Sequence, residues 1–147
     1  MTKYLVVAHE TASSPFLLEE LRHIQAEDET AEFTLLVPAT PVRHLLLWRG
    51  SSEEATAVAT ELAARTLKTF QEGQVNLVAA RVGAGIPLEA IGDEVTANPG
   101  YGGFVISTLP QEHSRWLLMD LPSKVEAKYG LPTHHVTMPP EVFLELS

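Results

Sequence analysis

The chain contains no cysteine, and this absence excludes several kinds of site. None of the 147 residues is Cys, so disulfide bonds, thiolate catalysis and cysteine-ligated zinc or iron–sulfur centres are excluded. Long apolar runs are also absent, since none approaches the roughly 20 residues that span a bilayer. Residues 1–10 lack the longer apolar region and the cleavage site of a signal peptide. We therefore expect a cytoplasmic protein without a membrane partner.

Basic residues are scarce. Ten Lys and Arg stand against nineteen Asp and Glu, which gives a formal net charge of −9. The basic residues are scattered singly, whereas nucleic-acid binding needs clustered cations that replace phosphate counterions. The sequence therefore predicts no nucleic-acid partner. The length suits one core and one domain, and we assign residues 1–138 to a single α/β domain and 139–147 to a C-terminal tail.

Five β-rich runs alternate with helical segments along the chain. Continuous apolar runs suit strands that are covered on both faces of a parallel sheet, and the predicted strands are residues 4–8, 32–37, 75–80, 104–107 and 131–136. The alternation predicts a parallel sheet with helices on both faces.

Helix ends carry recognisable signals. Ser14 and Pro15 suit the N-cap and first position of one helix, and Asp120 suits the N-cap of the last. Gly73 suits the left-handed position that follows a helix. The pair Gly83 and Gly85 indicates a flexible loop after the third strand.

Polar side chains follow the predicted strands at their carboxyl ends. Ligands of open α/β sheets are usually held at this edge. We expect a small-molecule ligand site there, and its candidate residues are Ala8, His9, Glu10, Thr11, Val37, Ser107, Thr108, Ser114, Arg115 and Asp120.

Two interpretations stay open for these side chains. His9 either binds a ligand and titrates near neutrality or is an ordinary, partly exposed loop histidine. Ser107, Thr108 and Ser114 either donate to a ligand, with Arg115 as a charge clamp, or cap the loop and the next helix. No residue is assigned a catalytic role. His134 and His135 should point to opposite faces of a strand, so no metal site is predicted.

The chain resembles the universal stress protein family, because nearly all of it follows the five-strand, four-helix order of that family. The closest likeness is in the last third of the chain. Residues 115–125, RWLLMDLPSKV, stand where that family has an RLLLGSVSERV-like segment, and residues 131–136 take the place of its CPVLVV-like edge strand. The resemblance implies a three-layer flavodoxin-like fold, also seen in adenine-nucleotide α-hydrolases. It has a five-stranded parallel sheet in the order 3-2-1-4-5, helices on both faces and often a homodimer.

The glycines by which family members bind ATP are missing. Those members carry Gly-x2-Gly-x9-Gly-Ser/Thr after the fourth strand, so that phosphates reach backbone N–H groups. Here residues 107–114, STLPQEHS, contain no glycine, and Met119 and Asp120 replace the later Gly-Ser pair. His9 replaces the family's acidic residue. We therefore predict a divergent member without standard ATP binding, in which ATP binds weakly or not at all and ATP or AMP is at most a weak ligand.

Four functional hypotheses follow. The first is a universal-stress-like protein that binds a small ligand or regulates, without standard ATP binding and without turnover. The others are an adenine-nucleotide-binding stress protein or nucleotide-hydrolysing enzyme on this scaffold, and a dimeric interaction module without ligand. Exposed sheet edges are usually covered or paired, so we expect a homodimer through the last strand, with contacts from Leu131, Thr133, His134, His135 and Val136.

Overall fold

The computed structural model describes residues 2–9, 11–12, 14–39, 52–108 and 120–137. The nine elements within these segments are, in chain order, β1 Lys3–Val7, α1 Pro15–Glu27, β2 Glu32–Pro38, α2 Ser52–Glu72, β3 Leu77–Gly83, α3 Pro87–Ala97, β4 Gly103–Thr108, α5 Leu121–Tyr129 and β5 Thr133–Thr137. None of the described helices is long and apolar enough to cross a membrane.

The five strands form one parallel sheet in the order β3-β2-β1-β4-β5. This order confirms the predicted fold. From β1 the chain proceeds outward through β2 to β3, and it then returns to β4 and continues outward to β5 on the other side. The direction of the connections therefore reverses between β1 and β4, which makes their carboxyl ends the topological switch point of the sheet.

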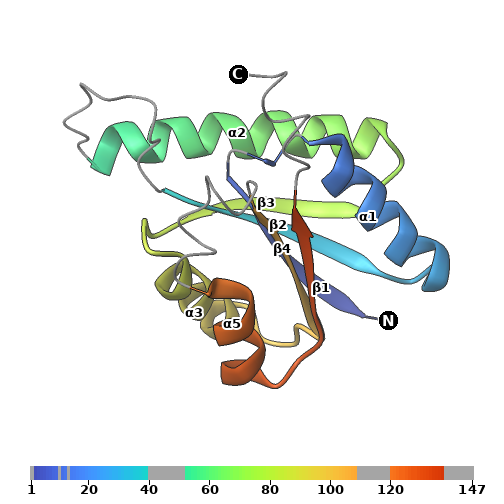
Figure 1. Ribbon diagram of the computed structural model, residues 1–147. Helices are drawn as coiled ribbons and strands as arrows, with labels where there is room; N and C mark the ends of the chain where they lie inside the picture. The colour runs from blue at the N-terminus through green and yellow to red at the C-terminus, as the bar shows by residue number, and fades with distance from the viewer. Residues whose placement is uncertain (1, 10, 13, 40–51, 109–119, 138–147) are drawn as a thin grey trace.

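Helices cover both faces of the sheet, with α1 and α2 on one face and α3 and α5 on the other (Figure 1). Each face has its own core, because successive residues of a strand point to opposite sides. Val6 packs in the core beneath α1 and α2, whereas Leu5 and Val7 pack in the core beneath α3 and α5. This double burial explains the unbroken apolar runs of β1, β2 and β4.

The start of α1 agrees with its sequence signal. The Ser14 hydroxyl oxygen accepts a hydrogen bond from the Phe16 N–H at 3.1 Å, and Pro15 occupies the first turn. Leu17, Leu21 and Ile24 are buried. The cap and the apolar stripe together fix where α1 begins and which face it turns to the sheet.

The end of α2 differs from its prediction. Gln74, and not Gly73, has the left-handed backbone, with φ 66°, and its N–H donates to the Gln71 carbonyl oxygen at 3.1 Å. Gly73 is small for another reason. A Cβ there would lie 3.3 Å from Leu18 Cδ1, so this glycine lets the end of α2 approach α1.

β3 also differs from its prediction, because the strand extends to Gly83. A Cβ on Gly83 would lie 2.7 Å from Ala90 Cβ, a separation that real side chains do not tolerate. The glycine thus allows α3 to pack closely on the sheet. It has a packing role, and the predicted flexible loop begins one residue later.

Candidate functional site

The structure brings several predicted site residues to the carboxyl ends of β1 and β4. His9 and Thr11 follow β1, and Ser107 and Thr108 end β4. All four side chains are buried although they are polar. Buried polar groups at the topological switch point make this edge the candidate functional site.

Two hydroxyl groups of the site form a pair. Thr11 Oγ1 lies 2.6 Å from Ser107 Oγ, and this buried hydrogen bond ties the loop after β1 to the end of β4. One hydroxyl donates and the other accepts, so the accepting hydroxyl keeps a proton that it can donate to a third group. The pair therefore offers one further donor without any charge.

His9 carries an unsatisfied polar atom. The residue is only 6% exposed, and its buried Nε2 makes no hydrogen bond to the described part of the chain. This burial contradicts the interpretation of a partly exposed loop histidine. Burial also lowers the pKa of His9, so the imidazole is neutral at pH 7. A buried polar atom without a partner costs about 1–3 kcal/mol.

Thr108 does not join the hydroxyl pair. Its Oγ1 lies 2.9 Å from His135 Nε2, on the sheet face opposite to Ser107. Adjacent strand residues point to opposite faces, so the Ser107 and Thr108 hydroxyls lie on opposite faces of the sheet, and their predicted roles toward a ligand stay predictions. A second hydroxyl oxygen, Thr137 Oγ1, lies 3.2 Å from the same His135 Nε2. Partial burial lowers the pKa of His135.

The apolar members of the predicted site are core residues. Ala8 and Val37 are fully buried in the core beneath α1 and α2. The Ala8 N–H donates to the Leu36 carbonyl oxygen at 3.2 Å, which continues the sheet beyond β1. Both residues therefore belong to the hydrophobic core.

Asp120 has the predicted position but not the predicted role. It is the N-cap residue of α5, with φ 55° and ψ 44°, and its side chain makes no capping hydrogen bond. Left-handed backbone is tolerated by Asp better than by most residues, which explains why this residue type stands there. The other predicted site residues, Glu10, Ser114 and Arg115, lie outside the described residues.

The predicted dimer edge is β5, which lies at one edge of the sheet. His134 and His135 face opposite sides, as predicted. His134 Nδ1 lies 3.8 Å from Glu20 Oε1, and its ring stacks edge-on against Tyr4. Leu131, Thr133 and Val136 are half-buried along this edge. Within the described segments, no three His, Asp or Glu side chains are grouped to hold a metal ion.

Sequence reasoning missed one buried polar cluster, beneath α3. The Glu94 carboxylate is 6% exposed. Its Oε2 accepts hydrogen bonds from Tyr101 Oη at 2.7 Å and from Asn98 Nδ2 at 3.0 Å, and Arg81 Nε lies 3.3 Å away. Burial, and next the bond to Glu94, raise the pKa of Tyr101 to about 12. The sequence carries one signal for this burial: Glu94 lies three residues after Ile91, so both residues lie on the same face of α3.

No protein-family model matches the chain, and no curated protein matches it in sequence. Its fold is similar to the crystal structure of a universal stress protein family protein from Arabidopsis thaliana with AMP bound. The TM-score is 0.58 and the sequence identity is 12%, and the match covers 97% of this chain and 95% of that chain. The similarity therefore extends over the whole fold, while so low an identity transfers no residue role.

Proposed function

We propose that this protein is a universal-stress-like binding protein that holds a small ligand at the carboxyl ends of β1 and β4. The observation that carries this proposal is the buried Nε2 of His9, which has no partner among the described residues. Native proteins satisfy almost all buried polar groups. A ligand that bonds to this nitrogen would recover the free energy that the folded chain loses by burying it.

The first ligand to test is an adenine nucleotide. The neighbour of the same fold was crystallised with AMP, and the switch point of an open α/β sheet is where such ligands bind. Residues 107–114 lack the glycines that would bring backbone N–H groups to phosphates, and Pro110 has no N–H. The proposal is therefore binding of AMP through the nucleoside, with ATP bound no more tightly.

Binding without turnover is part of the proposal. Nucleophilic catalysis by a hydroxyl needs an adjacent base. The Thr11 and Ser107 hydroxyls bond to each other, and neither bonds to His9. Within the described part of the site, no nucleophile is therefore paired with a base.

Calorimetric titration with AMP, and separately with ATP and magnesium, tests this function. We expect AMP to bind and to raise the unfolding temperature, as any ligand of the native state does, and 31P NMR to show AMP unchanged after long incubation. Absence of binding at millimolar AMP would contradict the proposal. ATP binding with a Kd below about 1 μM, equivalent to about 8 kcal/mol, would contradict the inferred loss of the phosphate cradle.

A second proposal concerns assembly. β5 is an edge strand whose residues are half-buried or exposed, and exposed edges are usually covered or paired. We propose a homodimer through this edge, with a stress-related role in the cytoplasm. Sedimentation of the wild type tests it. A wild type that is monomeric at micromolar concentration would contradict the dimer.

A further inference from the structure

One hydrogen bond shows which backbone groups of β5 point out of the sheet. The Phe104 N–H of β4 donates to the Pro132 carbonyl oxygen at 2.9 Å, and Phe104 pairs with Thr133. Alternate residues of a strand turn their N–H and C=O groups to opposite sides. Residue 132 faces β4, and residues 134 and 136 therefore face it too. The outward groups belong to Thr133, His135 and Thr137, and no described strand lies beyond them.

The other edge strand, β3, is protected against pairing. Its register shifts between Phe33 and Thr34 of β2, which makes Val78 an extra residue, and such bulges interrupt an edge. Gln71 Nε2 already donates to the Leu77 carbonyl oxygen at 3.0 Å. β5, in contrast, pairs with β4 without irregularity and contains no Asp, Glu, Lys or Arg. Of the two edges, β5 is therefore the one that suits a further strand.

Symmetry limits how two copies of β5 can pair. A two-fold axis perpendicular to the sheet joins them antiparallel and keeps each face of the sheet on its own side. Residues opposite one another in such a pair point to the same face, whereas neighbours in one strand point to opposite faces. The numbers of opposite residues therefore differ by an even number. The axis consequently passes between one residue and its own mate.

His135 is the residue at the axis that pairs every outward group. His135 then lies opposite its own mate, and Thr133 lies opposite the partner's Thr137. An axis one residue earlier would place Thr137 opposite Leu131, whose carbonyl oxygen already accepts the Thr133 hydroxyl at 3.2 Å. An axis one residue later would place Thr133 opposite Pro139, which has no N–H to donate. Either shift leaves backbone groups of the edge unpaired.

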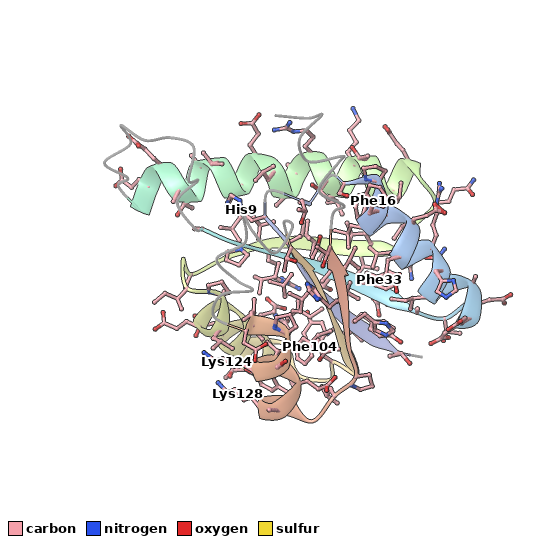
Figure 2. All side chains as sticks on the ribbon, in the orientation of Figure 1. His9, Phe16, Phe33, Phe104, Lys124 and Lys128 are labelled. Atoms are coloured by element: carbon pink, nitrogen blue, oxygen red, sulfur yellow. The ribbon has the colours of Figure 1, made fainter. Side chains whose placement is uncertain are left out.

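The side chain of His135 leaves room at the axis. Its Nε2 lies 2.9 Å from Thr108 Oγ1 of β4, so the ring lies toward its own sheet and away from a second copy. Figure 2 shows Lys124 and Lys128 on the side of α5 away from β5. These two cations therefore place no like charges against their mates at the pairing edge.

We propose that two copies of the chain join through β5 into one continuous sheet, with the two-fold axis at His135 and with Thr133 opposite the partner's Thr137. This inference rests on the proposed homodimer and adds its register. The interface is self-complementary, because each copy supplies the donors that the outward carbonyls of the other copy need. The occupant of this edge is therefore a second copy of the same chain.

Single cysteines test this register, because the wild type contains none. A hydrogen-bonded antiparallel pair has its Cα atoms about 5.5 Å apart, which lies within the range that a disulfide spans. His135→Cys should therefore form a disulfide-linked dimer under mild oxidation. His134→Cys is the matched control, since its mate lies two residues out of register, about 8 Å away and beyond the reach of a disulfide. We expect His135→Cys to link at least about tenfold faster on non-reducing gels.

A second pair of variants keeps His135 and its contact with Thr108 intact. Thr133→Cys and Thr137→Cys should each stay unlinked alone, because each mate lies four residues out of register, about 13 Å along the strand. A mixture of the two proteins should link, since these positions lie opposite each other across the axis.

Sedimentation of the wild type separates the register from the dimer itself. If the wild type is a dimer and His134→Cys links as fast as His135→Cys or faster, the register is wrong. A mixture of Thr133→Cys with Thr137→Cys that stays unlinked would equally overturn it. A monomeric wild type would instead contradict the proposed homodimer, and the register would fail with it.

Discussion

Glu94 and His9 are equally buried, and their surroundings differ in one respect. Each residue is 6% exposed. The Glu94 carboxylate has hydrogen bonds from Tyr101 and Asn98 and an ion pair with Arg81, whereas His9 Nε2 has no partner among the described residues. Burying a carboxylate without partners would cost more free energy than burying a neutral imidazole. The described residues thus satisfy the Glu94 carboxylate and leave the His9 Nε2 without a hydrogen bond. The Glu94 cluster therefore stabilises the fold, whereas the unpaired Nε2 of His9 is the basis of the proposed ligand site.

The largest expected effect comes from removing the satisfied group. Glu94→Ala should lower the free energy of unfolding by about 3 kcal/mol, because it leaves the buried Tyr101 hydroxyl without its acceptor and breaks the tie between α3 and β3. Urea denaturation measures the loss. Glu89→Ala is the matched control, since Glu89 is exposed on the same helix. A loss below 1 kcal/mol for Glu94→Ala would remove the distinction between the two regions.

A smaller effect should follow from removing one donor of the same cluster. Tyr101→Phe should cost about 1 kcal/mol, the net value of one buried hydrogen bond, because Asn98 and Arg81 still satisfy Glu94. The folded pKa of Tyr101, about 12, lies above the unfolded value of 10. Its stabilisation is therefore complete below pH 10 and is lost as pH rises toward 12. Chemical denaturation at pH 9 and pH 11 should show this loss in the wild type and less of it in Tyr101→Phe.

The contribution of His9 to stability should be lost as pH falls, whereas that of Tyr101 is lost as pH rises. The pKa of His9 is lower in the folded protein than the ordinary value of 6.5. Its neutral form therefore stabilises the fold above pH 6.5, and this contribution is lost as pH falls through the folded pKa. Between pH 7 and pH 5, His9→Phe should lose less stability than the wild type. His135 shifts in the same direction, so His135→Gln is the comparison that separates the two residues, and equal pH profiles for wild type and His9→Phe would contradict this account.

Much of the fold could be predicted from residues that act locally. The apolar runs of the strands indicate a sheet that is covered on both faces, and Ser14 with Pro15 places the start of α1 correctly. The end of α2 could not be placed as well, because Gly73 is required by its contact with Leu18 and the left-handed residue is Gln74. Glycine indicates either a left-handed turn or a close packing contact, and the sequence alone does not distinguish the two.

The places of the candidate residues in the fold were predicted, but their environment was not. The carboxyl ends of β1 and β4 follow from the order of the strands, so His9, Thr11 and Ser107 could be placed together. The burial of His9 depends on tertiary packing, which the sequence around it does not reveal. Glu94 was missed for a related reason, since its partners Arg81 and Tyr101 reach it only after α3 has packed on the sheet.

The stability of His9→Phe without ligand tests the central claim most directly, with His9→Leu as a smaller replacement. Replacing a buried, unpaired polar group by an apolar one of similar shape is neutral or stabilising. We therefore predict that urea denaturation at pH 7 will show an unfolding free energy equal to that of the wild type or up to about 1 kcal/mol higher. A loss of more than 1 kcal/mol in both variants would show that Nε2 is already satisfied in the folded chain, and His9 would then belong with Glu94 among the structural residues.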